Sequence, residues 1–251
     1  MFQELCWRFN QKSKMKPLQQ KSSVGKALIF DSSSLISLSL NGLLEELKKL
    51  KKIFNGEFII TKEVKQEVVD TPLKIKEYEL EALKIQDLID EGYLKMPDKL
   101  GIQDKEITDL TIKLMNLANT MFLGNRNEIS LIQLGEASCL ALSKIINERK
   151  IKNVLVIDER TTRMLVEKPE NLKELLEKKM HVQIKLKESN FKSFKEFKII
   201  RSAELMYLAY KKNLIEWKGK EILDALLYAL KFKGCAISID EIEEIKKLNS
   251  K

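Results

Sequence analysis

Two short runs of apolar residues, each ending in an acid, stand out along the chain. Ala27 to Phe30 lead into Asp31, and Val154 to Ile157 lead into Asp158. An unbroken apolar run of this length predicts a strand buried on both faces, as in a parallel sheet, although a buried helical segment has the same pattern. Ligands of open α/β sheets bind at the carboxyl ends of the strands, so both acids are predicted to face a crevice at one edge of the sheet.

The rest of the chain alternates between patterns typical of strands and patterns typical of helices. Further strands are predicted at 57–60, 182–186 and 197–200, and helices at 42–54, 61–68, 72–91, 102–122, 130–148, 171–179, 203–212, 222–232 and 239–248. The connection at 93–101 contains Pro97 and Gly101, which interrupt the helical pattern. Strands that alternate with helices favour an α/β fold with a central, mainly parallel sheet and helices on both faces.

Three parts are predicted from this order of elements. Residues 1–25 are polar and basic, and we expect a poorly ordered arm there, because termini are ordered only where contacts hold them. Residues 26–200 are expected to form the α/β domain. The helical part at 201–251 either packs on that domain or is appended to it.

The net positive charge of the chain favours a polyanionic ligand. The 251 residues carry a net charge of +8, from 45 basic and 37 acidic residues. Apolar residues make up 44% of the chain and charged residues 33%, a balance typical of a globular protein with a charged surface. A basic protein with a group of acids suits a metal-dependent enzyme that acts on a polyanion, because phosphates attract cations and metal ions need carboxylates. A basic protein without such an activity has the same composition.

The cysteine and histidine content argues against several kinds of site. Cys6, Cys139 and Cys235 are too few and too scattered for a disulfide framework or a zinc site, and His181 is the only histidine. Zinc, Ser-His and Cys-His chemistry are therefore not expected. No apolar run approaches the ~18 residues of a membrane span, and the first residues lack the apolar core of a signal peptide. We expect a cytoplasmic protein that does not contact a membrane.

Two further acids lie in predicted helices. Glu67 follows the second predicted strand, and Glu136 lies beside Gly135 in a helix rich in small residues. Glycine inside a helix costs about 1 kcal/mol relative to alanine, so Gly135 indicates that another group approaches closely. Simpler roles are open for all these acids. Asp31 and Asp158 are also suited to cap helices, and the two Glu residues to lie solvated on a helix surface.

In this order the four acids resemble the site of PIN domains, a nuclease fold. PIN domains carry an acid after the first strand, a Glu in the helix after the second, an acid in a later helix and an Asp after a further strand. The matching residues here are Asp31, Glu67, Glu136 and Asp158. The most similar segments are LGEASCLALS at 134–143 and VLVIDERTTR at 154–163, and residues 199–215 resemble the tail of prokaryotic, VapC-like members.

The resemblance, which covers about 26–248, implies a divalent-metal-dependent endoribonuclease that hydrolyses phosphodiester bonds of RNA. Asp31 and Asp158 would coordinate the metal, and Glu67 and Glu136 would coordinate it or position water. Oxygen ligands alone select hard cations such as Mg²⁺ or Mn²⁺. Neighbouring residues are candidates to support the acids or to contact phosphate: Ser32, Ser33, Glu159, Arg160 and Arg163. VapC-like toxins imply two further partners, a protein antitoxin and a second copy in a homodimer, whereas other members process RNA.

The sequence departs from the family pattern at two places. Gln133 stands where many relatives carry an extra Asp, and 167–197 looks like an insertion before the last strand. Two other functions are compatible with the sequence. A protein that binds RNA or another partner without cutting it needs the basic surface but not the carboxylates. A haloacid-dehalogenase-type phosphatase needs a second Asp two residues after the first, and Ser33 occupies that place, so this class ranks low.

Overall fold

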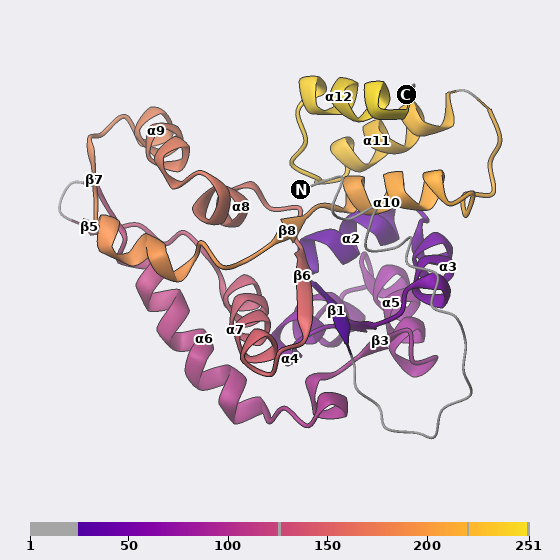
Figure 1. Ribbon diagram of the computed structural model, residues 1–251, viewed down its shortest axis with the longest axis horizontal. Coiled ribbons are helices and arrows are strands. Elements are labelled where there is room, and N and C mark those ends of the chain that lie inside the picture. The colour runs from indigo at the N-terminus through magenta and orange to yellow at the C-terminus, as the bar shows by residue number, and fades with distance from the viewer. Residues whose placement is uncertain (1–24, 125–126, 220, 250–251) are drawn as a thin grey trace.

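A five-stranded parallel sheet forms the centre of the molecule (Figure 1). The structure is a computed structural model that describes residues 25–124, 127–219 and 221–249. The sheet has the strand order β3-β2-β1-β6-β8. Its strands are β1 (Lys26–Phe30), β2 (Glu57–Ile59), β3 (Leu94–Lys95), β6 (Lys152–Val156) and β8 (Ile199–Ile200). The two apolar runs that end in an acid form β1 and β6, whose last four residues are all buried. This confirms the predicted parallel sheet.

Strand order reverses between β1 and β6. The chain passes from β1 to β2 and β3 on one side, and returns to β6 and β8 on the other. β1 and β6 pair in parallel, with Phe30 opposite Val156. The backbone N–H of Asp31 donates to the Val156 carbonyl at 3.0 Å, and Ser34 Oγ donates to the same carbonyl at 2.9 Å. A crevice for ligands forms at the carboxyl ends of the strands at such a reversal, and Asp31 lies there.

Helices cover both faces of the sheet, which confirms the predicted α/β class (Figure 1). One layer consists of α4 (Lys62–Lys65), α6 (Asp104–Asn119) and α7 (Leu134–Glu148). The other layer consists of α2 (Ser32–Leu40), α3 (Leu44–Ile53), α5 (Glu79–Asp90) and α10 (Ser202–Lys211). In the first layer α7 packs directly on β1 and β6, and in the second α10 contacts both α2 and α3.

A second, antiparallel sheet of three strands lies at the left of Figure 1. Its order is β5-β4-β7, with β4 at Phe122–Gly124, β5 at Asn127–Glu128 and β7 at Ile184–Leu186. The segment that the sequence marks as an insertion supplies β7, the helix α9 (Pro169–Met180) and the 3₁₀ turn η4 (Glu188–Ser193). It therefore pairs with the segment between α6 and α7 and not with the main sheet.

The helices after β8 pack on the α/β domain. They are α10, α11 (Ile222–Phe232) and α12 (Ile239–Asn249), and buried α10 residues such as Met206 belong to the same hydrophobic core as the sheet. Arg201, which is only 6% exposed, forms an ion pair with Glu204 and another with Glu241 of α12 at 2.8 Å. A buried guanidinium needs such partners, so this network holds α12 to the start of α10.

Several boundaries differ from the prediction. The helix expected at 72–91 starts at Glu79, after the 3₁₀ turn η2 (Pro72–Lys74), and the helix expected at 102–122 ends at Asn119, before β4. Other elements had no counterpart in the sequence pattern: β3, the 3₁₀ turn η3 (Pro97–Leu100) and the helix α8 (Arg160–Glu167). The two-residue β3 exists through pairing of Leu94 opposite Phe58, and such a contact leaves no periodic pattern.

The predicted N-terminal arm and one of the three cysteines are not described by the structure. The basic arm predicted at 1–25 lies, apart from Gly25, outside the described residues, and so does Cys6. Cys139 and Cys235 are buried free thiols. Within the described ranges, no helix combines the length and the apolar character needed to cross a bilayer.

Candidate functional site

Asp31 has one engaged and one orphaned oxygen at the end of β1. Its Oδ2 caps α2, accepting from the Ser33 backbone N–H at 3.1 Å and from Ser33 Oγ at 2.6 Å. Its Oδ1 is buried and has no hydrogen-bond partner among the described residues. Burial raises the pKa of Asp31 to about 6, against the effect of the Ser33 bonds and with added repulsion from Glu67. The side chain therefore caps a helix and also presents a free oxygen that suits a cation or a proton.

Glu67 reaches the same place from a π-helical turn, η1 (Gln66–Asp70), which continues α4. The backbone N–H of Thr71 donates to the Gln66 carbonyl five residues back at 3.0 Å. Such turns are rare and occur frequently at functional sites. The Glu67 carboxylate lies against Gly135, since a Cβ added there would be 2.6 Å from both of its oxygens. This confirms the close approach that the glycine in the α7 helix predicts.

Glu136 adds a third carboxylate, from the first turn of α7. One oxygen accepts from the backbone N–H of Gln133, as in a capping box. Burial raises the pKa of Glu136 to about 8; the Gln133 bond lowers it, and the charges of Asp31, Glu159 and Glu67 raise it. We call Asp31, Glu67 and Glu136 the acidic cluster. Among the described residues, no Lys or Arg forms an ion pair with any of these three side chains.

The Asp158 carboxylate is engaged elsewhere. Its Oδ1 accepts from the backbone N–H of Ser202 at 2.7 Å and its Oδ2 from Ser202 Oγ at 2.5 Å. Burial raises the pKa of Asp158, and the bonds from Ser202 lower it. Both oxygens thus bind the start of α10, and no described hydrogen bond joins this carboxylate to the other three acids of the four-acid prediction. The next side chain, Glu159, lies close enough to raise the pKa of Glu136.

The remaining predicted residues have separate places. The Ser33 hydroxyl, besides donating to Asp31, accepts from the backbone N–H of Asp158 at 3.1 Å, and so joins the ends of β1 and β6. A backbone hydrogen bond from Ser32 also lowers the pKa of Asp31. Glu159 caps α8 by accepting from the Thr162 N–H at 2.7 Å. These residues hold and flank the acidic cluster.

Arg160 and Arg163 lie on α8 and line a pocket between that helix and the connection from α11 to α12. Arg163 donates to the Ala236 carbonyl at 2.9 Å, which places its guanidinium on the connection between α11 and α12. That pocket was not predicted from the sequence, because its two walls are about 70 residues apart along the chain and no shared motif connects them.

The acidic cluster fits a hard divalent cation by its chemistry. Its donors are carboxylate oxygens, one of them buried without a partner, and Mg²⁺ and Mn²⁺ prefer such ligands. As the side chains stand, no group of three His, Cys, Asp or Glu residues in the described ranges could hold a metal ion. Binding would therefore require the half-buried Glu67 and Glu136 to turn toward the ion, while Asp31 stays in place.

Replacing Gly135 by Ala is predicted to weaken ion binding without lowering the stability of the metal-free protein. The added methyl would overlap the Glu67 carboxylate, the far end of a flexible side chain that can move aside. Alanine favours a helix by about 1 kcal/mol over glycine. We expect an unfolding free energy equal to the parent's or up to about 1 kcal/mol higher, and a smaller stabilisation by Mn²⁺. Urea denaturation in EDTA and in Mn²⁺ measures both, and an unchanged response to Mn²⁺ would contradict this role of the glycine.

Comparison with known proteins adds no relative. No family model matches the sequence, and neither a curated protein nor a solved structure matches it. The function is therefore proposed from the acidic cluster, its surroundings and the two segments that resemble PIN domains.

Proposed function

We propose that the protein is a divalent-metal-dependent ribonuclease that hydrolyses phosphodiester bonds in RNA. The observation that carries the proposal is the acidic cluster at the reversal between β1 and β6. Three carboxylates from different elements share a negative field there, and no Lys or Arg in the described residues is paired with them. Such a site attracts a cation, and oxygen-rich metal sites commonly act on phosphates. The segments that resemble PIN domains support RNA as the substrate.

Each residue of the acidic cluster has a role in this proposal. Asp31 would bind the ion through Oδ1, while Ser33 keeps the other oxygen in place. Glu67 and Glu136 would complete the ligands or hold the attacking water. When bound, Mg²⁺ or Mn²⁺ supplies a Lewis acid that polarises the phosphate and lowers the pKa of water. Glu136, with a pKa of about 8 in the absence of an ion, is suited to hold a proton near neutral pH.

Cleavage of a labelled single-stranded RNA by the full chain tests the proposal. We expect products with Mg²⁺ or Mn²⁺ and none in EDTA, because the carboxylates alone repel the phosphate. DNA of the same sequence and a small phosphoester, p-nitrophenyl phosphate, are the comparison substrates. Hydrolysis of the small ester with intact RNA would indicate a phosphatase and would overturn the ribonuclease.

A binding protein without catalysis is the second candidate. One observation favours it, namely that the carboxylates of the described residues are not yet arranged to hold a metal ion. This candidate predicts that RNA binds and stays intact with either ion. It also predicts the same affinity after Asp31→Asn, because binding alone does not need the carboxylate.

A further inference from the structure

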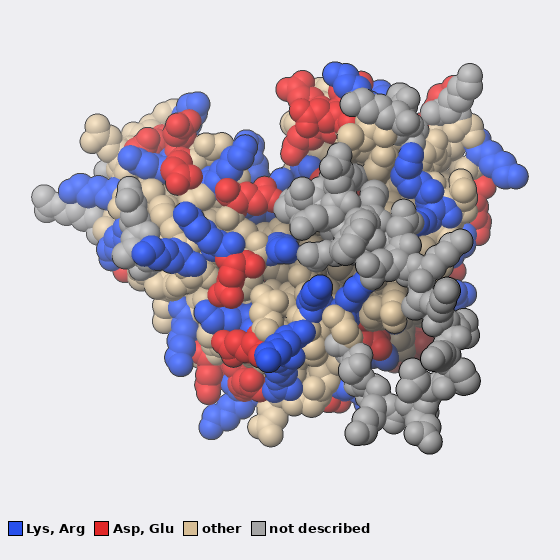
Figure 2. All heavy atoms as spheres, in the orientation of Figure 1, with Lys and Arg blue, Asp and Glu red and all other residues tan. Residues whose placement is uncertain are grey.

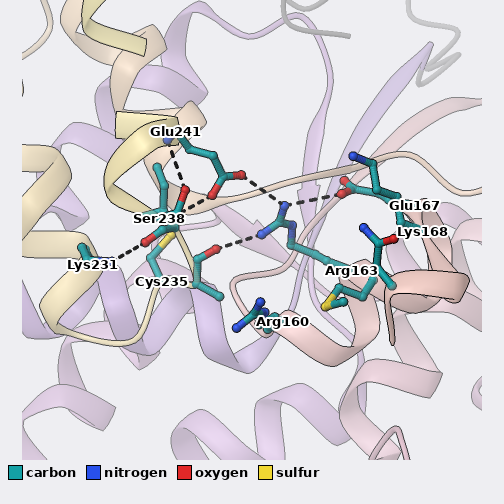
Figure 3. A pocket seen from close by; sticks show the side chains of 12 residues that line it. Arg160, Arg163, Glu167, Lys168, Lys231, Cys235, Ser238 and Glu241 are labelled. Carbon is teal, nitrogen blue, oxygen red and sulfur yellow. Dashed lines mark hydrogen bonds and ion pairs between the residues drawn. The ribbon is translucent and has the colours of Figure 1, made fainter. Parts of the chain in front are cut away.

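A basic pocket, lined in part by the residue that follows Glu159, is not used by the proposed chemistry. Its cavity of about 560 Å³ lies between the α8–α9 segment and the connection from α11 to α12 (Figure 3). Figure 2 shows the molecule hollowed between the part that contains α9 and the part that contains α12. Four basic and two acidic side chains line it: Arg160, Arg163, Lys168, Lys231, Glu167 and Glu241. Its formal charge is therefore 4 − 2 = +2.

Two of the basic side chains build the walls of the pocket. Besides its bond to Ala236, the Arg163 guanidinium lies 3.4 Å from Glu167 and 3.9 Å from Glu241. Lys231 Nζ donates to the Ile237 carbonyl at 2.6 Å. Figure 3 shows this bonded network across the upper part of the pocket. Glu167 and Glu241 are thus both paired with Arg163 in the wall of the pocket, which reduces their repulsion of an anion.

The other two basic side chains stand outside this network of bonds. Arg160 and Lys168 are exposed, and no hydrogen bond or ion pair joins either of them to another described residue. Figure 3 shows Arg160 apart from the network around Arg163. A guanidinium offers a planar fork of donors that matches phosphate oxygens, and an ammonium adds a point charge. The α12 N-terminus, at Ser238 in the lining, adds a partial positive charge on the same side.

The pocket is connected to the acidic cluster through the end of β6, where Asp158 and Glu159 lie. Arg160 follows Glu159, whose charge reaches Glu136, and the backbone N–H of Ala236 donates to the Asp158 carbonyl at 3.0 Å. The floor of the pocket is therefore fixed to the end of β6, which carries Asp158 and Glu159. A nucleic-acid strand with one phosphate at the acidic cluster would extend its neighbouring phosphates over the start of α8.

We infer that this pocket binds a backbone phosphate of the RNA next to the bond that is cut. The inference rests on the proposed function and adds to it the path of the strand, from the acidic cluster across α8 into the pocket. Arg160 and Lys168 make the contacts, Arg163 joins the two walls of the pocket, and Lys231 fixes the α11–α12 wall. The contact is sequence-independent, because phosphates carry no base information.

The test compares Arg160→Ala, Lys168→Ala and their double variant with Lys179→Ala, a lysine that is exposed on α9 outside the pocket. Binding of a fluorescein-labelled single-stranded RNA is measured by anisotropy in EDTA at several salt concentrations. Each single pocket variant should lose about tenfold in affinity, as expected for a hydrogen bond between charged groups, and the double variant about 100-fold. The salt slope should fall by roughly 0.7 in each single variant and by roughly 1.4 in the double variant, and Lys179→Ala should match the parent.

Kinetics with Mg²⁺ distinguish the two proposals. The pocket variants should raise KM and leave kcat close to the parent's, because the contact is the same before and during cleavage. If the parent cuts RNA and the double variant equals it in affinity, salt slope and KM, the pocket inference fails and the ribonuclease stands. If the parent neither binds nor cuts RNA, both fail. An oligo-glutamate peptide that competes as well as RNA at equal charge would identify an acidic protein ligand and overturn the inference.

Discussion

Asp31→Asn should lower the rate of RNA cleavage by more than about 100-fold. Substitutions one step removed from the ligands of a metal already cost 10- to 100-fold in affinity or activity, and Asp31 is assigned as the ligand itself. Asparagine keeps the size of the side chain and an oxygen that can accept from Ser33, so the capped end of α2 should persist. The measurement is single-turnover cleavage at saturating Mn²⁺. A rate within threefold of the parent's would remove Asp31 from the chemistry.

Asp158→Asn is the matched control for that substitution. It removes the charge from a carboxylate of the same type that binds Ser202 through both oxygens. The loss should appear as an unfolding free energy lower by about 1 to 3 kcal/mol, with a smaller effect on the rate of the folded protein. Full stability with no cleavage would mean that Asp158 turns into the acidic cluster in the active protein, as the resemblance to PIN domains implies.

In metal-free buffer, the acidic cluster should make the protein less stable as the pH rises from about 4 to about 8. Asp31 has a pKa of about 6 in the folded protein against 3.8, and Glu136 about 8 against 4.5. Between the two values of each pair the folded state binds more protons than the unfolded state, so its stability falls with rising pH. For the buried Asp31 alone, the loss is on the order of 3 kcal/mol.

Two comparisons isolate this effect from the other titrating groups. Asp31→Asn should be more stable than the parent at pH 8 in EDTA, because it removes a buried charge, and its stability should fall less between pH 4 and 6, where only Glu136 of the two groups then contributes. Mn²⁺ should stabilise the parent more at pH 8 than at pH 5, since protons compete for the same oxygens. Urea denaturation at these pH values measures both. A parent more stable than Asp31→Asn at pH 8 in EDTA would show that the charge is neutralised within the protein.

The main sheet could be predicted because its inner strands leave a strong local pattern. The runs at 27–30 and 154–157 are apolar on both faces, as strands covered by helices on both sides must be, and they lie in β1 and continue just past β6. The helix predicted at 222–232 coincides with α11. The strand predicted at 197–200 contains β8, whereas the two-residue β3 depends on pairing with β2, so its sequence carries little information of its own.

The site could be predicted in part. The acids after β1 and in α7 were found because a strand end and a helical glycine mark them. The partner of Asp158 could not be predicted, because its carboxylate accepts hydrogen bonds from Ser202, 44 residues further along the chain. The basic pocket depends on tertiary packing in the same way.

Glu241 forms ion pairs with two arginines from different parts of the molecule. One is Arg201 at the start of α10, at 2.8 Å, and the other is Arg163 on α8, at 3.9 Å. One carboxylate thus balances the buried charge that anchors the last helix and part of the charge around the basic pocket. A mutation at this position would disturb both at once. Over evolution, the attachment of that helix and the electrostatic character of the neighbouring cavity are therefore constrained to change together.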